Sequence, residues 1–149
     1  MKGEAKFTYD YMRSLDQDGL FWYKLPDNMY TGKKPFDVFS MKSGEACAYE
    51  FKYHHTLDVF SFSQVQEHQI DSLEKFKAAG GRAFIVLGIK LNLSLAQQEK
   101  YSLTKRRISH IKMWDVDDFK TLIKTEKSFS ILKYLKENYV RRSGTEEGT

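Results

Sequence analysis

The sequence has very little cysteine and no long apolar run. Its single cysteine, Cys47, cannot form an internal disulfide and has no CxxC partner for zinc or redox chemistry, so we expect a core residue. No stretch approaches the ~18 apolar residues of a membrane span, and the N-terminal residues lack the apolar stretch of a signal peptide. We therefore expect a cytoplasmic protein that has no membrane contact.

Internal repeats, low-complexity linkers, a Gly-rich phosphate loop and a nucleophilic Ser/His/Asp order are also missing. What is present is 149 residues that are 41% hydrophobic and 15% aromatic, which suffices for one domain with one core. We expect this domain to span residues 1–140. Residues 141–149 are charged, contain two glycines and lack an apolar anchor, which predicts a flexible tail.

The charge is mildly basic, because 24 Lys and Arg exceed 20 Asp and Glu. This excess does not by itself imply a nucleic-acid partner. Three clusters are more informative, Lys33-Lys34, Lys105-Arg106-Arg107 and Arg141-Arg142. A basic cluster is usually a solvated surface and becomes a phosphate-binding surface only beside a functional site.

Hydrophobic periodicity and turn residues predict an α/β domain with a central mixed sheet flanked by helices. The expected helices cover residues 5–15, 63–79, 117–124 and 128–138, and the expected strands cover 20–25, 36–41, 46–53, 83–89 and 108–114. Ser63 and Gln66 fit a capping box at the start of the second helix, which Gly80-Gly81 ends. The continuous apolar run 83–89 is typical of a strand buried on both faces.

The hairpin over residues 36–53 holds the first candidate for chemistry. If Ser43-Gly44 forms a two-residue turn, opposed residues have numbers that sum to 87, and Asp37 lies across from Glu50. A four-residue loop gives the same register, whereas an odd-length loop breaks it. Two opposed carboxylates repel each other unless a positive charge lies between them, and Mg²⁺ binds one or two carboxylates with water and phosphate.

Strand alternation places Lys52 on the same face as Glu50, whereas Tyr49 and Phe51 point to the opposite, buried face. The Lys52 ammonium can then position an attacking water or stabilise charge on phosphoryl oxygens. The alternative is a surface strand whose Glu50 and Lys52 side chains are only solvated.

Two amides interrupt the apolar stripe of the following helix. Gln66 and Gln69 lie near its start, where a phosphate or a metal-bound water can be their partner. Hydrogen bonds from these two amides to nearby backbone groups explain their position in the stripe equally well. His68 beside them contacts DNA or simply caps the hairpin end. A zinc site at His54-His55 is disfavoured, because adjacent residues of a strand point to opposite faces.

Taken together, these motifs resemble the PD-(D/E)xK nuclease superfamily, and within it RecU-type Holliday junction resolvases. The resemblance rests on Pro35-Phe36-Asp37, Tyr49-Glu50-Phe51-Lys52, His68-Gln69 and the strand that begins at Ala83. It covers residues 20–89, about half of the chain, and is compatible with 114–138. Because each motif is short, the joint order and spacing carry the resemblance.

The resemblance implies a restriction-endonuclease-like core and a Mg²⁺-dependent homodimer that cuts branched or four-way DNA, with Mn²⁺ as a substitute metal. It implies Asp37 and Glu50 as metal ligands, Lys52 as the catalytic lysine and Gln69 as an auxiliary site residue. We add Phe51 to the expected metal site. The expected DNA-binding residues are Lys33, Lys34, Gln66, His68, Lys105, Arg106 and Arg107.

The chain departs from the family pattern in two ways. Family members often place a glutamate on the first helix, but here Phe7 and Thr8 stand at that point and Glu4 lies one turn earlier. There is also no long insertion to form a protruding stalk. Two other functions stay open: a restriction- or repair-type nuclease acting on duplex ends, and a non-catalytic DNA-binding module with the same fold.

Overall fold

The structure is a computed structural model that describes residues 3–26 and 33–140. The expected tail, 141–149, lies outside the described residues. The helices are α1 (Gly3–Ser14), α2 (Glu67–Ala78), α3 (Leu95–Tyr101), α4 (Val116–Leu122) and α5 (Ile131–Asn138), with a 3₁₀ turn η1 (Phe62–Gln64). The strands are β1 (Leu20–Lys24), β2 (Val38–Lys42), β3 (Glu45–His54), β4 (Phe60–Ser61), β5 (Arg82–Asn92), β6 (Arg107–Asp115) and β7 (Ser128–Phe129). In the described part of the chain, no helix has the length and apolar character needed to cross a membrane.

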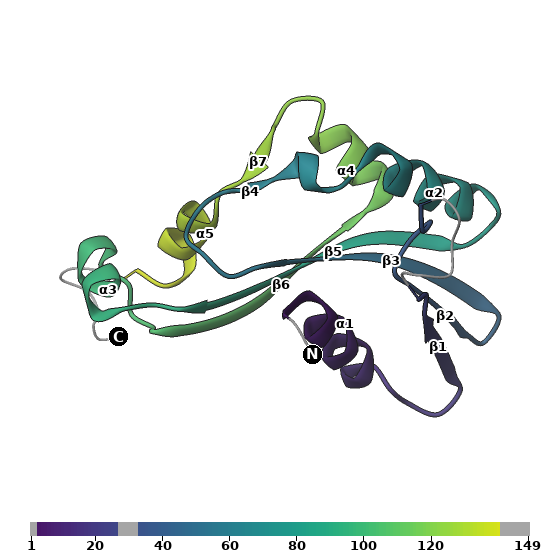
Figure 1. Ribbon diagram of the computed structural model, residues 1–149, viewed down its shortest axis with the longest axis horizontal. Helices are drawn as coiled ribbons and strands as arrows, with labels where there is room; N and C mark the ends of the chain where they lie inside the picture. The colour runs from purple at the N-terminus through teal and green to yellow at the C-terminus, as the bar shows by residue number, and fades with distance from the viewer. Residues whose placement is uncertain (1–2, 27–32, 141–149) are drawn as a thin grey trace.

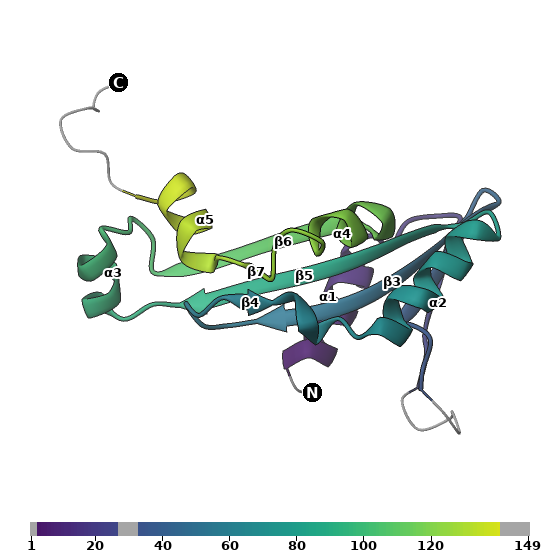
Figure 2. The same cartoon turned by 90° about the horizontal axis from the view of Figure 1, so that it is seen from above.

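A five-stranded mixed sheet forms the centre of the molecule, in the order β1-β2-β3-β5-β6. Among the described strands of this sheet, only β3 and β5 pair in parallel, whereas β1–β2, β2–β3 and β5–β6 are antiparallel. Helix α1 lies on one side of this sheet, and α2, α4 and α5 lie on the other, as Figures 1 and 2 show from two directions. The predicted α/β architecture, a mixed sheet flanked by helices, is confirmed.

Both faces of the sheet are buried at its centre. On the α2 side, alternate β5 residues such as Ile85 and Leu87 pack with Leu73 of α2 and Phe119 of α4. On the α1 side, a smaller cluster surrounds Phe51. Residues 83–89 are all buried, which confirms the strand predicted from the apolar run. The remaining members of the smaller cluster are Phe7, Met12, Val38, Tyr49, Phe84 and Val86.

The β2–β3 hairpin has the predicted register. Ser43 and Gly44 both have positive φ, 50° and 80°, as a two-residue hairpin turn requires. Val38 pairs with Tyr49, and each further pair has residue numbers that sum to 87. Because this turn is local, the sequence alone suffices to set the pairing of these two strands.

Several predicted boundaries are wrong. The helix expected over 63–79 begins at Glu67, because residues 62–64 form η1 and Gln66 occupies the N-cap. The predicted Ser63–Gln66 capping box is therefore replaced by one in which the Gln66 N–H donates to Gln69 Oε1 at 2.9 Å. The last helix begins at Ile131 rather than 128, since Ser128–Phe129 pairs with β4. Helix α3 was not predicted; Ser94 caps it.

Candidate active site

Asp37 lies one residue before the first β2–β3 pair and is 8% exposed. Its N–H donates to the Tyr49 carbonyl at 3.0 Å, and its Oδ2 accepts a hydrogen bond from the Phe51 N–H at 2.8 Å. Its Oδ1 forms an ion pair of 2.7 Å with the Lys34 ammonium. Asp37 thus lies just outside the β2–β3 pairs. Its carboxylate accepts the hydrogen bond from the Phe51 N–H that a backbone carbonyl of a neighbouring strand would otherwise accept.

Glu50 lies in the middle of β3 and is 2% exposed. Its Oε2 accepts a hydrogen bond from Gln69 Nε2 at 3.0 Å and lies 3.4 Å from the Lys52 ammonium. Its Oε1 is buried, and no donor among the described residues reaches it. On that oxygen, only a proton or a cation can compensate the negative charge.

This environment raises the pKa of Glu50 to about 9. The first cause is burial, which disfavours the charged form. The second is Asp37, whose negative charge repels a Glu50 carboxylate and whose carboxylate can accept a hydrogen bond from protonated Glu50. Lys52 and Lys34 oppose the rise but do not cancel it. Without a bound cation, Glu50 is therefore protonated at neutral pH. Perturbation of this kind is common at functional sites.

Gln69 serves both the helix and the site. Its Oε1 accepts from the Gln66 N–H at the start of α2, which fixes the orientation of the amide. Its Nε2 then points at Glu50 Oε2. Gln69 thus holds one Glu50 oxygen in place while the other remains open, and its auxiliary role in the site stays a prediction.

Replacing Gln69 with alanine is expected to lower the nuclease rate proposed below about 10- to 100-fold, because Glu50 loses its orienting donor. It should also cost about 1 kcal/mol of stability through the lost cap. A matched control is Ser94→Ala, which removes the acceptor of the Gln97 N–H at the start of α3. This control should cost similar stability and leave the rate unchanged. An equal loss of rate in both variants would refute the orienting role.

Glu4 is a site neighbour whose assignment the sequence left in doubt. The residue as a whole is exposed, but its carboxylate is partly desolvated, and this desolvation is the main cause of its raised pKa. The charge of Asp37 adds to the rise, whereas the charge of Lys52 and a hydrogen bond from the Tyr53 amide oppose it. The Phe51 and Tyr53 amides on the same edge of β3 are thus bound by Asp37 and Glu4. Only the packing of α1 across β3 reveals this.

The predicted DNA-binding residues fall into two groups. Lys33, Gln66 and His68 line one surface hollow of about 600 Å³ beside the start of α2. The pKa of His68 is lowered by partial desolvation and by the charges of Lys33 and Lys52. Lys34 contacts Asp37, so it belongs to the carboxylate site itself. Lys34 therefore contacts the carboxylate site and the other three lie together beside α2, while their binding of DNA stays a prediction.

Lys105, Arg106 and Arg107 form the second group, at the distant end of the sheet. Glu50 is in register with Ile85, and Arg107 is in register with Asn92, seven residues further along β5. At about 3.3 Å per residue, the separation along the strand is about 23 Å. This group does not border the carboxylates.

The donor set suits a divalent cation such as Mg²⁺. Asp37 and Glu50 supply oxygen ligands, and the buried Glu50 Oε1 lacks the compensating charge that a cation supplies. The described residues contain no group of three His, Cys, Asp or Glu side chains able to hold a metal. Mg²⁺ sites in proteins often use one or two carboxylates and complete the shell with water and substrate.

No protein-family model matches the chain, and no curated protein matches its sequence. Among solved structures, the chain is similar to Hjc from Archaeoglobus fulgidus, a Holliday junction resolvase from an archaeal hyperthermophile. The two chains are 17% identical with a TM-score of 0.46, and the match covers 92% of this chain and 94% of that chain.

Proposed function

We propose that this protein is a Mg²⁺-dependent endonuclease that hydrolyses phosphodiester bonds in DNA. The observation that carries the proposal is the buried pair of Asp37 and Glu50, with one Glu50 oxygen lacking a donor and Lys52 beside the other. A pair arranged in this way is unfavourable for the protein alone, because burial and mutual repulsion disfavour its double ionisation. It suits a site that acquires a cation with its substrate.

The side chains then have separate roles. Asp37 and Glu50 would hold the metal, and the Phe51 amide and Gln69 keep one oxygen of each carboxylate fixed. When bound, Mg²⁺ supplies Lewis-acid polarisation of the phosphate and lowers the pKa of water. Lys52 is placed to orient the attacking water and to stabilise negative charge on the phosphoryl oxygens.

The alternative functions differ in what they require of this site. A non-catalytic DNA-binding module has no use for a buried acidic pair, which repels phosphate and costs stability, so the pair favours catalysis. A nuclease acting on duplex ends requires the same site and differs only in the DNA it accepts. We favour structure-selective cleavage of branched DNA, in keeping with the sequence motifs.

Incubation of the purified protein with labelled four-way junction, fork and linear duplex, with and without Mg²⁺, tests this proposal. We expect Mg²⁺-dependent cutting of the junction and the fork, with Mn²⁺ able to replace Mg²⁺, and slower cutting of linear duplex. Preferential cutting of duplex ends would favour the repair-type alternative. Binding without cutting of any of these DNAs would favour the non-catalytic module.

We also propose a homodimer, because symmetric cleavage of a junction requires two sites related by a two-fold axis. The aromatic residues of the first helix and the first strand are candidates for its interface, namely Phe7, Tyr9, Phe21 and Tyr23. Phe7 belongs to the monomer core, and Tyr9 packs against Trp22. The other two, Phe21 and Tyr23, are 57% and 48% exposed and flank the Phe39 ring at 5.9 and 6.2 Å.

Light scattering at micromolar concentration is expected to give the mass of a dimer, and the double variant Phe21→Ser/Tyr23→Ser should give that of a monomer. The physical reason is that these exposed rings lose water contact in the interface. The double variant Phe7→Ser/Tyr9→Ser cannot test the interface, because Phe7 is a core residue and its replacement would destabilise the monomer itself. A monomeric wild-type protein that cleaves junctions normally would refute the dimer.

A further inference from the structure

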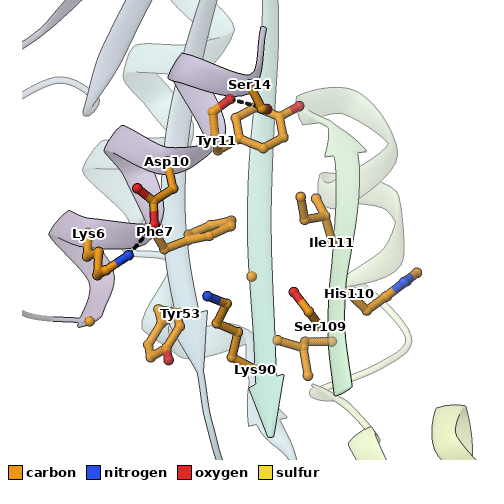
Figure 3. A pocket seen from close by; sticks show the side chains of 13 residues that line it. Lys6, Phe7, Asp10, Tyr11, Ser14, Tyr53, Lys90, Ser109, His110 and Ile111 are labelled. Atoms are coloured by element: carbon orange, nitrogen blue, oxygen red, sulfur yellow. Dashed lines mark hydrogen bonds and ion pairs between the residues drawn. The ribbon is translucent and has the colours of Figure 1, made fainter. Parts of the chain in front are cut away.

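A continuous groove follows the α1 side of the sheet beyond the end of β3. One part of it, about 260 Å³, lies between α1 and strands β5 and β6 (Figure 3). The second part, about 660 Å³, extends past the last residues of β3. Gly3, Tyr53, Lys90 and Ser109 line both parts, so the two join. Nothing in the proposed cleavage chemistry uses this groove.

The charges that line the groove are mostly positive. Lys6, Lys90 and Arg107 line it, against Asp10 as the acidic residue of the lining. Asp10 is already paired with Lys6 at 2.6 Å. In the described part of the chain, neither Lys90 nor Arg107 takes part in an ion pair. The hydrogen bond from Lys6 is the main cause of the lowered pKa of Asp10, and Lys90 lies close enough for its charge to add to it. Since neither Lys90 nor Arg107 is held in a direct ion pair within the described residues, both can contact an anionic ligand.

The groove leads to the most basic end of the molecule. Segments 90–107 and 131–140 contain seven Lys and Arg residues against two Glu residues, an excess of five positive charges. The whole chain has a net charge of only +4, so the remainder is slightly negative. These segments adjoin each other, since the Thr104 N–H donates to the Tyr139 carbonyl at 2.7 Å. The field at this end attracts phosphates.

The groove also has an aromatic platform. The ring of His55, an exposed residue, stacks on the ring of Tyr53, with centroids 5.7 Å apart and planes inclined by 20°. The backbone of Gly3 approaches the Tyr53 ring so closely that a Cβ at this position would come within 2.8 Å of the ring. Aromatic rings beside cations are the usual elements that bind single-stranded nucleic acid, because bases stack on them while phosphates contact Lys and Arg.

The size of the groove favours a single strand over a duplex. Its two parts, about 260 and 660 Å³, are of the order of small-ligand sites and have room for a nucleotide or two. We propose that this groove binds a single-stranded DNA segment that continues from the cleavage site, with phosphates on Lys90 and Arg107 and a base on His55. The proposal rests on the proposed function for its choice of DNA, and it specifies a substrate with an unpaired strand beside the scissile bond.

The position of the groove fits this path. Tyr53 follows Lys52 in β3, and its amide binds Glu4 beside the carboxylates. The last β3–β5 pair is His54 with Ile89, and Lys90 is the next residue of β5. Within the described strands, β5 has no pairing partner in β3 from Lys90 onward. Glu50 points towards α2, whereas the groove lies on the α1 side, so the strand must pass around the β3 edge that β2 leaves free beyond Tyr49. From that edge, beside Glu4, it reaches Lys90 and then Arg107.

Fluorescence anisotropy of a labelled oligothymidylate, measured in EDTA at several salt concentrations, tests the proposal without cleavage. The double variant Lys90→Ala/Arg107→Ala should weaken binding about tenfold. It should flatten the plot of log K against log salt by about 1.4, since each single-strand contact contributes about 0.7. His55→Ala should weaken binding severalfold with the salt slope unchanged, because it removes a stacking partner and no charge.

The matched control is Lys75→Ala/Lys124→Ala, which removes two exposed lysines outside the groove lining and should leave affinity and slope unchanged. Equal behaviour of the groove variant and this control would overturn the proposal. An equal loss of affinity for linear duplex would overturn the single-strand assignment. Loss of oligothymidylate binding in the groove variant, with no cleavage of any DNA by the wild-type protein, would support the groove and reject the nuclease function.

Discussion

Replacing Glu50 with glutamine or Asp37 with asparagine is expected to lower DNA cleavage about a thousandfold and to leave DNA binding within about twofold of wild type. Each change keeps the shape of the side chain but removes a negatively charged metal ligand. The loss is of the size seen when one preorganised electrostatic partner of a transition state is removed. Single-turnover cleavage of the preferred DNA at saturating protein and Mg²⁺ measures it.

Glu45→Gln is the matched control for this experiment. Glu45 lies on the same strand as Glu50, but its side chain is exposed and its partner Arg82 is 3.8 Å away. The same carboxylate-to-amide change there should leave cleavage unaltered. Near-normal cutting by either variant at saturating Mg²⁺ would remove the substituted residue from the metal site, and the nuclease proposal would lose the carboxylate pair that carries it.

The Glu50→Gln variant is also expected to be more stable than wild type in the absence of metal, by on the order of 3 kcal/mol at pH 7. The folded protein holds a proton on Glu50 up to a pKa of about 9, whereas the unfolded chain releases it near the ordinary glutamate pKa of 4.5. Between these values, the native state binds more protons than the unfolded state. Wild-type stability contributed by this group therefore falls as the pH rises through this window.

Urea denaturation in EDTA at pH 5, 7 and 9 checks the sign of this effect. The stability difference between the Glu50→Gln variant and wild type should be small at pH 5 and grow steadily towards pH 9. Glutamine is compatible with the site, because its oxygen can accept from Gln69 while its amide donates to Asp37. Glu45→Gln should show no such trend, and a pH-independent difference for Glu50→Gln would refute the raised pKa of Glu50.

The parts of the site that were predictable from sequence are those set by local geometry. A two-residue turn at Ser43-Gly44 determines the β2–β3 register, and alternation along β3 places Glu50 and Lys52 on one side. The register therefore placed Asp37 close to Glu50, as the structure also has it. The predicted start of α2 at Ser63 was wrong, because the local polar residues fit a helix cap equally well at Ser63 or at Gln66. In the structure, the η1 turn next to the β4–β7 pair occupies residues 62–64, and the helix starts after Gln66.

What the sequence by itself determined is the hairpin, the buried strand β5 and the residue types of the acidic pair, because turns, periodicity and composition act over a few neighbouring residues. The tertiary structure decided the rest. Burial under α2 raises the pKa of Glu50, the α2 cap directs Gln69 towards it, and α1 brings Glu4 to the edge of β3. These effects depend on the desolvation and approach of elements distant in the chain, which only the packed sheet establishes.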